Sequence, residues 1–362
     1  MRVALVHDYI KEYGGAERVL EALHEIWPDA PVYTTVNLPE FLGPHIKRFD
    51  GWDIRTSWLQ GIPFRHKLIS PFRILMPFVF GQFDFSDFDV VIVSATGAYF
   101  PNLLNKKKAV QICYCHTPPR YLYGYATARE WKKNIVFRIL GEIANHFLRI
   151  ADFNSSKNVD YYIANSQEVA ARIKKFYKRE AVVVYPPIDT TGSIKGKEKG
   201  KYYLAGGRLA RPKHIDLIIK ACRDLNVPLK VFGKGFAGYE KEIKGSEFVG
   251  EVSDEEKWKL MRNAKAYINA SEDEDFGITP VEAMSAGTPV IAYKSGGVVE
   301  SVVEGKTGIF FEELSVESLK KAMKQFNNAI IDPNDCVKQA QRFSKERFKS
   351  EIQLFISRVV KA

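Results

Sequence analysis

The chain has 362 residues, of which 46% are hydrophobic and 27% are charged, and it carries a formal net charge of +10 with four cysteines. Because domains usually span roughly 100–200 residues, this length predicts two domains, and so few cysteines exclude a disulfide scaffold. No stretch reaches the ~18 uninterrupted apolar residues of a spanning helix, which argues against a membrane-spanning protein. The positive charge suits phosphates, nucleic acid or an anionic membrane surface, and it does not choose among them.

The first half alternates short apolar runs, which are typical of buried strands, with helical patterns. The chain opens on such a run and not on a signal peptide, so we expect a cytoplasmic protein with reduced thiols. Gly14-Gly15 precede a helical pattern over 16–26, and Ser166 is a predicted helix N-cap with Glu168 in the first turn. Strands are predicted over 3–6, 90–94, 109–114, 161–164 and 182–185.

The stretch 188–201 is rich in Gly, Lys and Thr and is predicted to be a linker, after which the alternation restarts. Strands are predicted over 202–205, 229–232, 248–250, 266–269, 289–292 and 308–311. Helices are predicted over 215–221, 257–262, 280–285 and, near the chain end, 344–360.

Runs of β-branched residues separated by helices favour parallel sheets that are covered on both faces. The predicted fold is therefore α/β, with two doubly wound, Rossmann-like domains whose sheet ends face each other across a cleft. Ligands bind at the carboxyl ends of strands in such sheets. In the first half these ends carry Gly14-Gly15, Thr96-Gly97, His116 and Asn165-Ser166.

Two carboxylates stand out in the stretch 271–292. Glu274 lies on a loop after a strand, and Glu282 lies eight residues later, within the predicted helix. Both could accept hydrogen bonds from the hydroxyl groups of a sugar or a ribose. Taken alone, Glu274 could be a loop carboxylate and Glu282 a solvated helix residue. Because Glu282 stands beside Ala283 and Met284, where a lone charge is expensive, we expect a ligand partner for it.

A second group of residues follows the strand over 202–205. Gly206-Gly207 would let the backbone approach a ligand closely. Arg208 could donate two hydrogen bonds to a diphosphate through its guanidinium group, and Lys213 could add the charge of its ammonium group. As isolated residues they would read as a basic surface loop. Their place at a strand end, opposite the carboxylate pair, favours the diphosphate.

In combination these motifs resemble retaining glycosyltransferase family 4, which has the GT-B fold. The two glutamates separated by seven residues are that family's signature, and the resemblance covers nearly the whole chain. Within the family, Glu-Asp-Phe-Gly-Ile-Thr-Pro-Val-Glu and Cys-His-Thr-Pro-Pro-Arg-Tyr look most like mannosyltransferases of surface-polysaccharide assembly. The motifs that carry the resemblance are Gly14-Gly15-Ala-Glu-Arg-Val, His116, Gly-Gly-Arg208-Leu with Lys213, Glu274 to Glu282, Gly-Thr-Pro-Val-Ile-Ala292 and Gly296-Gly297-Val-Val-Glu300.

The resemblance implies an N-terminal acceptor-side domain over 1–188 plus 344–362 and a C-terminal nucleotide-sugar domain over 189–343. In the C-terminal domain Arg208 and Lys213 would grip the donor diphosphate, with Gly207 beside them. Glu282 would bind the ribose, and the backbone of Val249 would meet the nucleobase. Glu274 would contact the transferred sugar, together with the backbone N–H groups of Phe276, Gly277 and Ile278.

In the N-terminal domain, the resemblance implies that His116 lies over the sugar and that Gly14 and Gly15 close their loop on the diphosphate or the acceptor. Glu274, Arg208, Lys213 and His116 are the expected catalytic residues. One departure is His214, where many members have glycine after the lysine, and it puts the shape of this loop in doubt.

The expected activity is a retaining, metal-independent transfer of a hexose, mannose from GDP-mannose by resemblance, to a glycan or lipid-linked glycan. Arg208 and Lys213 would stabilise the departing diphosphate, and no cofactor is expected. Two alternatives remain open, a UDP-sugar-dependent transferase of the same fold and a catalytically inert nucleotide-sugar-binding protein.

Other signals are weaker. Asp87-Phe88-Asp89 resembles a metal-binding pair but is better explained as a polar strand entry, and Cys113, Cys115 and His116 lack a second ligand cluster for zinc. No Gly-x-Gly-x-x-Gly follows the first strand, and Gly233-Lys-Gly235 lacks the third glycine, which argues against a nicotinamide enzyme. No nucleic-acid motif accompanies the basic charge, so no nucleic-acid partner is expected.

A basic and apolar stretch lies in the N-terminal domain. It combines Arg65-His-Lys and Arg73 with phenylalanines between 64 and 83, and Lys106-Lys-Lys108 adds charge nearby. Such a surface could lie on anionic lipid headgroups at the inner face of the cell membrane and reach a lipid-linked acceptor. The alternative is a segment packed on the core with solvated charges.

Overall fold

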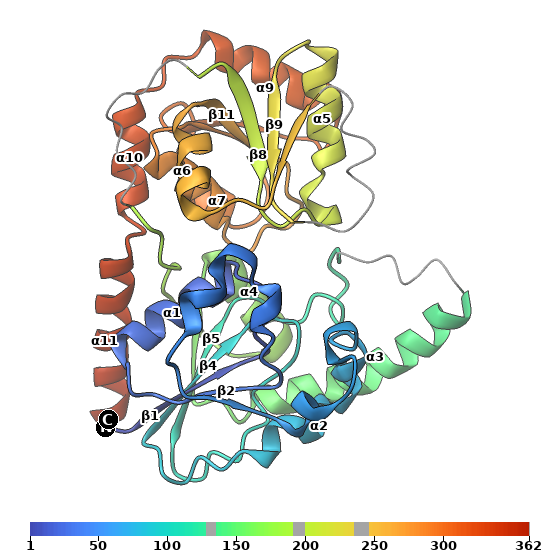
Figure 1. Ribbon diagram of the computed structural model, residues 1–362, viewed down its shortest axis with the longest axis vertical. Helices are drawn as coiled ribbons and strands as arrows, with labels where there is room; N and C mark the ends of the chain where they lie inside the picture. The colour runs from blue at the N-terminus through green and yellow to red at the C-terminus, as the bar shows by residue number, and fades with distance from the viewer. Residues whose placement is uncertain (128–134, 191–199, 235–245, 362) are drawn as a thin grey trace. The chain divides into compact units, whose positions relative to one another are not determined.

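The chain forms two compact units. The computed structural model describes residues 1–127, 135–190, 200–234 and 246–361 (Figure 1). Unit 1 comprises Met1–Tyr125, Glu130–Pro186 and Phe348–Ala362, and Pro187–Arg347 lie in unit 2. The predicted linker over 188–201 and the Gly233-Lys-Gly235 motif each lie partly outside the described residues.

Unit 1 is built on a seven-stranded sheet with the order β3-β2-β1-β4-β5-β6-β7, and every pairing between neighbours is parallel. In β1, Ala4 and Val6 pack into one apolar cluster and Val3 and Leu5 into another, so both faces of the sheet are buried. The strands are β1 Val3–His7, β2 Val32–Thr34, β3 Ile54–Thr56, β4 Val90–Ala95, β5 Val110–Cys115, β6 Tyr161–Ala164 and β7 Ala181–Val183.

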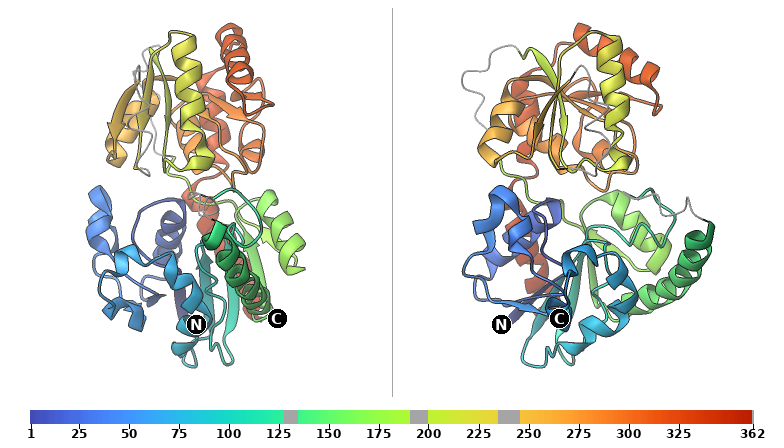
Figure 2. Two further views of the ribbon diagram at one scale, coloured as in Figure 1. Left: turned by 90° about the vertical axis from the view of Figure 1, so that its right-hand side faces the viewer. Right: turned by 45° about the vertical axis from the view of Figure 1, so that its right-hand side comes forward.

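Helices cover both faces of this sheet (Figure 2). Leu148 and Ile173 of two helices join the cluster on one face, whereas Leu20 and Phe348 of two others join the cluster on the opposite face. The helices of unit 1 are α1 Gly15–Ile26, α2 Met76–Val79, α3 Ile135–Ser156, α4 Gln167–Tyr177 and α11 Lys345–Lys361, which begins in unit 2. Short 3-10 turns lie at Pro39–Phe41, Gly43–Phe49, Trp58–Gly61, Arg65–Lys67, Pro71–Leu75 and Phe80–Gln82.

Unit 2 is built on a six-stranded parallel sheet with the order β10-β9-β8-β11-β12-β13. Its apolar core joins the sheet to α5 and α9, while α7 contacts α6 and α10. The strands are β8 Tyr202–Gly206, β9 Leu229–Phe232, β10 Glu247–Gly250, β11 Ala264–Asn269, β12 Val290–Tyr293 and β13 Gly308–Phe311. The helices are α5 Ile215–Asp224, α6 Asp254–Arg262, α7 Ile278–Ser285, α8 Val298–Ser301, α9 Val316–Asn328 and α10 Pro333–Gln341, and a 3-10 turn, η8, spans Arg211–Lys213.

Two parallel sheets covered by helices confirm the predicted α/β, doubly wound fold class. The predicted Ser166 N-cap is also confirmed, because its hydroxyl accepts a hydrogen bond from the Val169 N–H. The sequence did not predict β2, β3 or the long α3. Both strands have only three residues, too few for a clear alternation of polar and apolar positions. No helix in the described part of the chain is long and apolar enough to cross a membrane.

Candidate functional site

The end of β8 turns through two glycines that a larger residue could not replace. A Cβ atom on Gly206 would overlap the ring of Phe232 at 2.4 Å. Gly207 has a φ of +102°, and a Cβ there would lie 3.3 Å from the Thr279 hydroxyl oxygen. Since Thr279 stands in the first turn of α7, this turn brings the exposed Arg208 to the strand end next to that helix.

Lys213 and Glu274 form an ion pair. The Lys213 Nζ lies 2.5 Å from the Glu274 Oε2, and the two side chains are 25% and 14% exposed. Burial opposes ionisation of Glu274, but the charge of Lys213 and hydrogen bonds from Lys213 and Ser271 outweigh it, so the pKa of Glu274 lies below its ordinary value. A cation and an ionised acceptor therefore stand together, although they are 61 positions apart in the chain.

His214 ends the turn that carries Lys213. It adopts the left-handed conformation, with a φ of +46°, and its Nε2 lies 3.3 Å from the Glu272 Oε2. Glycine adopts this conformation without strain. Histidine therefore occupies, at this departure from the family pattern, a backbone conformation that glycine would adopt without strain.

Gly296 and Gly297 lie against the backbone of the Glu274 loop. A Cβ on Gly296 would come within 2.2 Å of the Glu274 carbonyl oxygen, and one on Gly297 within 2.4 Å of the Asp275 carbonyl oxygen. The Gly297 N–H also donates to the Glu274 carbonyl at 2.7 Å. Glycine is therefore required at both positions, because only glycine lets this segment pack closely enough to fix the position of the Glu274 backbone.

The N-terminus of α7 follows Glu274 directly. The helix begins at Ile278, two residues before the predicted start, and Gly277 is its N-cap with a φ of +89°. Phe276 is buried and packs against Phe343 with the two rings tilted and their centroids 5.3 Å apart. No hydrogen bond within the described residues uses the Gly277 or Ile278 N–H, as expected for the first turn of a helix. These donors carry partial positive charge and can meet an anion or sugar hydroxyls.

Glu282 is buried within α7, and the structure provides a protein partner for it. Its Oε1 accepts a hydrogen bond from the Lys257 Nζ at 2.7 Å, and Lys257 also contacts the Asp254 Oδ1 at 3.0 Å. The burial of Glu282 therefore gives no reason to require a ligand, and its contact with a ribose stays a prediction. Lys257 was missed because the two residues are 25 positions apart and lie on different helices.

Val249 lies in an irregularity of the edge strand β10. Its neighbours Phe248 and Gly250 pair with β9, whereas Val249 has no partner in the register. The Gly233 N–H donates to the Gly250 carbonyl at 2.7 Å, and a Cβ on Gly233 would collide with the Gly207 carbonyl. The backbone of Val249 thus lies at the same sheet end as Gly207, although its contact with a nucleobase remains a prediction.

Gly14 and Gly15 begin α1 in unit 1. Gly14 is the N-cap, and its N–H donates to the Glu17 Oε2 at 2.8 Å. A Cβ on Gly14 would lie only 3.3 Å from that oxygen. The turn is therefore fixed by Glu17, a buried residue that the sequence analysis did not single out.

His116 follows β5 and is 8% exposed. Its Nε2 lies 3.0 Å from the Ser94 hydroxyl oxygen, which also lies 3.1 Å from the His7 Nδ1. Burial, with a smaller contribution from His7, lowers the pKa of His116 to about 3. His116 is therefore neutral at physiological pH and can act through hydrogen bonds but not as a cation.

Asp8 stands beside His7 and is fully buried. Its Oδ2 accepts hydrogen bonds from the Thr96 hydroxyl at 2.5 Å and from the Tyr99 N–H at 3.0 Å. Burial raises the pKa of Asp8 above its ordinary value, although His7 and the hydrogen bonds oppose the rise. Asp8 is therefore held in place by hydrogen bonds within unit 1.

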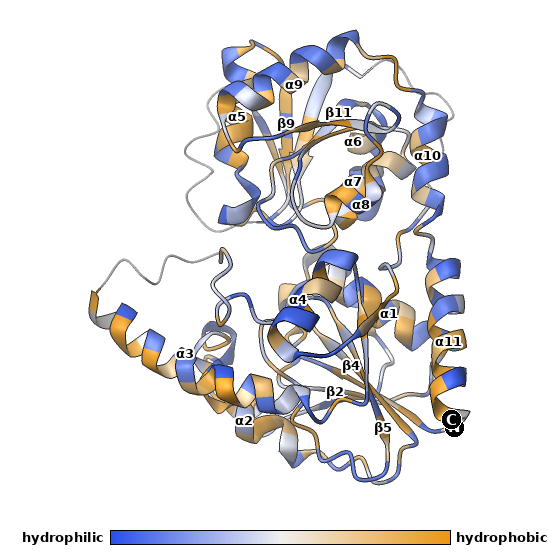
Figure 3. Ribbon diagram, turned by 180° about the vertical axis from the view of Figure 1, so that it is seen from behind, coloured by the Kyte–Doolittle hydropathy of each residue, from blue (hydrophilic) through white to orange (hydrophobic). Residues whose placement is uncertain are grey.

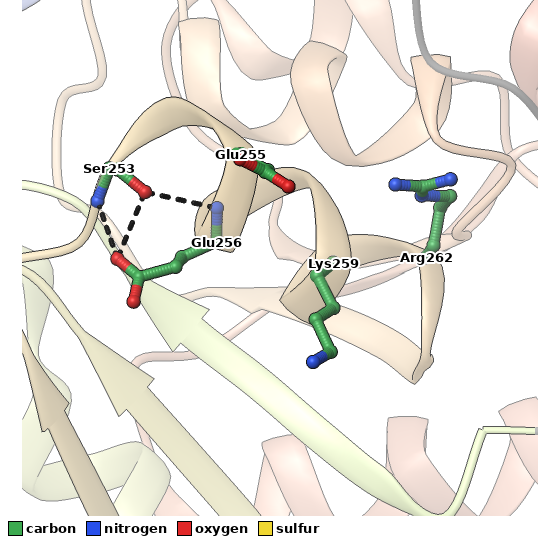
Figure 4. A pocket seen from close by; sticks show the side chains of 5 residues that line it. All are labelled: Ser253, Glu255, Glu256, Lys259 and Arg262. Carbon is green, nitrogen blue, oxygen red and sulfur yellow. Dashed lines mark hydrogen bonds between the residues drawn. The ribbon is translucent and has the colours of Figure 1, made fainter.

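Some other sequence signals have structural explanations. Asp89 accepts a hydrogen bond from the Arg2 N–H at 2.6 Å, as a polar strand entry would. Within the described residues no group of three or more His, Cys, Asp or Glu side chains is placed to hold a metal ion. A polar hollow on α6 contains none of the predicted site residues (Figure 4). It is lined by Ser253, Glu255, Glu256, Lys259 and Arg262.

Two family models match the chain and together cover most of it. The model described as "Glycosyltransferase Family 4" matches residues 13–191, and the model described as "Glycosyl transferases group 1" matches residues 188–343. The chain is 27% identical to Alpha-1,3/1,6-mannosyltransferase ALG2 of Dictyostelium discoideum over 299 residues, which cover 68% of each chain. It is 24% identical to the protein of the same name from Mus musculus, over 76% of this chain and 74% of that one.

Among solved structures, the Anabaena protein HepE in complex with UDP and glucose has the same fold. The TM-score is 0.70 at 17% identity, with 99% of both chains covered. This likeness agrees with the two parallel sheets of the structure. From the two family models and this fold, the chain belongs to glycosyltransferase family 4 and is a glycosyltransferase of the GT-B type.

Proposed function

We propose that the protein transfers mannose from GDP-mannose to a glycan or lipid-linked glycan, with retention of the anomeric configuration and without a metal ion. The observation that carries this proposal is the cluster at the β8 and α7 ends, where Lys213 pairs with Glu274 beside the free donors of a helix N-terminus. Such a cluster offers positive charge to a diphosphate and an acceptor to sugar hydroxyls.

The sugar is inferred from relatives that carry the name of alpha-1,3/1,6-mannosyltransferase. An α-linked product made from the α-linked GDP-mannose would be a retaining outcome. A UDP-sugar is the second candidate, because HepE was solved with UDP and glucose. A thermal-shift comparison of GDP-mannose, UDP-glucose and the free nucleotides tests the donor, since a ligand that binds the native state raises its stability. A larger shift with UDP-glucose would favour the alternative.

The proposed reaction breaks the bond between the sugar C1 and the β-phosphate oxygen, and the acceptor oxygen forms the new bond to C1. The acceptor proton passes to the departing phosphate oxygen on the same face, so no protein nucleophile is needed. Negative charge grows on the diphosphate as the bond breaks. Arg208, Lys213 and the α7 N–H groups would stabilise it most in the transition state, which is how preorganised donors raise a rate.

The variants Arg208→Ala and Lys213→Ala test this role. Each should lower kcat by roughly 10²–10³ if it acts like a lost oxyanion donor. Lys294→Ala is a matched control, because Lys294 forms its ion pair with Glu312 on the surface of unit 2 and should leave the rate unchanged. Wild-type rates in both site variants would remove these residues from the mechanism.

Three further measurements define the reaction class. NMR of the product should show the α-anomer, and a β-anomer would contradict retention. The rate should survive dialysis against EDTA, and a loss that Mg²⁺ or Mn²⁺ restores would contradict metal independence. Transfer to an acceptor, or slow hydrolysis of the donor, would exclude a catalytically inert nucleotide-sugar-binding protein.

We also propose that unit 1 touches an anionic membrane through a surface that we name the apolar-basic face. Along α3, apolar residues recur (Figure 3), and several of their large side chains are exposed, with Phe147 at 65%. The segment over 58–78 shares an apolar core cluster with α3, and its Phe64 and Phe78 side chains are exposed. The apolar-basic face comprises the basic residues Arg65, Lys67 and Arg73 and the exposed apolar residues Phe64, Ile74 and Phe78, with Ile135, Ile139, Leu140, Ile143, Phe147 and Ile150 of α3.

The charge around this face favours anionic lipid over another occupant. Residues 58–83 contain three Lys or Arg side chains, Arg65, Lys67 and Arg73, and not one Asp or Glu. Arg73 lies over the ring of Tyr121, and the Tyr121 carbonyl accepts a hydrogen bond from the Asn145 amide of α3. The basic segment and α3 therefore both contact Tyr121. Apolar side chains beside uncompensated cations are the arrangement that binds anionic headgroups.

Vesicle flotation tests the membrane contact. The protein should float with phosphatidylcholine vesicles that contain phosphatidylglycerol, float less with phosphatidylcholine alone, and lose binding in high salt. The triple variant Ile139→Ser, Ile143→Ser, Phe147→Ser should lose binding, whereas Ile330→Ser, at a 98% exposed position of unit 2, should not. Wild-type protein that stays with the soluble fraction, or a dimer that the triple variant abolishes, would contradict the proposal.

A further inference from the structure

Four buried side chains form a continuous line at the carboxyl end of the unit 1 sheet. The Glu17 Oε1 lies 3.5 Å from the His7 Nε2, and the His7 Nδ1 lies 3.1 Å from the Ser94 hydroxyl oxygen. The same hydroxyl oxygen lies 3.0 Å from the His116 Nε2. The Nδ1 of His116 makes no hydrogen bond within the described residues. The line therefore runs from a carboxylate to one open ring nitrogen.

The carboxylate gives the line a direction. Burial opposes ionisation of Glu17, but the interaction with His7 and backbone N–H groups outweighs it, so the pKa of Glu17 lies below its ordinary value. An ionised carboxylate only accepts hydrogen bonds, so the His7 nitrogen that faces Glu17, Nε2, is the one that carries a proton, and an uncharged His7 then accepts a hydrogen bond at Nδ1. Ser94 then donates to His7 and accepts from His116, which places the His116 proton on Nε2.

From this geometry we propose that Glu17, His7 and Ser94 are positioning residues that hold His116 in its Nε2–H tautomer, so that Nδ1 accepts a hydrogen bond from a hydroxyl of the sugar substrate. The identity of that ligand rests on the proposed function, whereas the tautomer follows from the contacts of unit 1 alone. An uncharged ring carries one proton, so fixing Nε2–H leaves Nδ1 as an acceptor only.

The surroundings of His116 support a binding role over a purely structural one. Its backbone is already held, because its N–H donates to the Ala95 carbonyl at 2.9 Å and its carbonyl accepts from the Asn165 amide at 3.0 Å. The side-chain contacts with Ser94, His7 and Glu17 are therefore not needed to hold the backbone of His116 in place. It also ends at Glu17, which fixes the Gly14 turn. One carboxylate thus orients both acceptor-side elements of unit 1.

The tautomer is measured directly by ¹⁵N–¹H correlation of the imidazole nitrogens in protein labelled with ¹⁵N-histidine, without substrate. The chain has seven histidines, so His116→Gln identifies the signal. We expect a protonated Nε2 and an unprotonated Nδ1 for His116 at pH 7. A protonated Nδ1 would overturn the inference, whatever the enzyme transfers.

Variants of the line test its effect on catalysis. Glu17→Gln should mix the two tautomers of His7 and His116, because an amide can donate as well as accept. Ser94→Ala should also mix the tautomers of His116 and lower kcat about tenfold, as the loss of one oriented hydrogen bond would, with a smaller change in KM. Ser94→Thr keeps the hydroxyl and should restore both the tautomer and the rate. Ser86→Ala, at an exposed position of unit 1, is the control.

These outcomes separate the two claims. A wild-type protein that keeps the Nε2–H tautomer but transfers no mannose would contradict the proposed function and leave the tautomer assignment intact. A folded Ser94→Ala protein with mixed tautomers and a wild-type kcat would overturn the positioning role. Thermal unfolding of each variant identifies any loss of rate that comes from loss of fold.

Discussion

Glu282 and Glu274 are both paired with lysine, but the pair at Glu282 is the more deeply buried. The side chains of Lys257 and Glu282 are 8% and 4% exposed, against 25% and 14% for Lys213 and Glu274. A buried carboxylate without its cation must be desolvated with no compensation. Lys257 is therefore almost closed to solvent, whereas part of the Lys213 side chain remains exposed.

Replacing Lys257 should therefore lower stability sharply. We expect Lys257→Met to lower the free energy of unfolding by about 3–5 kcal/mol, because Glu282 would stay buried and unpaired. Urea unfolding at pH 7 measures this change. Lys259→Met, on the exposed side of the same helix, should change stability by less than about 0.5 kcal/mol. If the double variant Lys257→Met, Glu282→Met is no more stable than Lys257→Met, the unpaired charge is not the cause.

At the scale of elements, the close approach of Gly296 to the Glu274 loop can be tested against a matched glycine. Gly296 and Gly305 both have positive φ, +68° and +77°, but a Cβ on Gly305 would meet nothing within 4 Å. Gly305→Ala should therefore cost only the strain of the left-handed backbone, about 1–2 kcal/mol.

Gly296→Ala should cost more, about 3 kcal/mol in all, because its Cβ would also displace the Glu274 backbone. It should also lower kcat, whereas Gly305→Ala should not. Urea unfolding and initial rates of both variants measure these effects. Equal losses of stability and unchanged rates would show that the loop can move without consequence.

The C-terminal helix α11 is a structural part of unit 1. Phe348, Ile352 and Ile356 are each at most 1% exposed and pack with β1 residues in one apolar cluster. We expect Ile352→Ala to lower the free energy of unfolding by about 2–4 kcal/mol, since it leaves a cavity in that cluster. Leu354→Ala, at a 52% exposed position of the same helix, should be nearly neutral. Similar losses for the two variants in chemical unfolding would contradict this packing.

At the scale of the whole molecule, one buried acid should make the stability of the protein depend on pH. Asp152 is 1% exposed and accepts hydrogen bonds from the Tyr123 hydroxyl at 2.7 Å and the Tyr177 hydroxyl at 3.2 Å. Burial raises the pKa of Asp152 to about 7, although both hydrogen bonds lower it. At pH values between the pKa of about 3.9 in the unfolded chain and the raised pKa in the folded state, Asp152 is protonated when folded and ionised when unfolded.

The stability contributed by Asp152 should therefore fall as pH rises from about 4 to about 7 and stay low above that. Asp152→Asn removes this titration and should flatten the curve by up to about 4 kcal/mol across the range. Urea unfolding of both proteins at pH 5 and pH 8 gives the difference. A wild-type slope in the variant would show that Asp152 is not the titrating group.

Much of this architecture could be predicted from the sequence. Strands such as β6 and β9 were predicted with their observed bounds, because a continuous apolar run between polar turns is a local signal. The glycine and glutamate motifs also predicted the family, since their residue types and their spacing can be read directly along the sequence. The three-residue strands β2 and β3 were missed because their signal comes from pairing with neighbours.

Most strands, the fold class and the family could be read from the chain alone, because they depend on local patterns and on spacing between residues. Which charged and hydrogen-bonding side chains pair with each other became known from the three-dimensional fold. It paired Glu282 with Lys257 and joined His7 to Ser94, 87 positions away. Partners at such separations are set by sheet order and helix packing, and no local pattern in the chain records them.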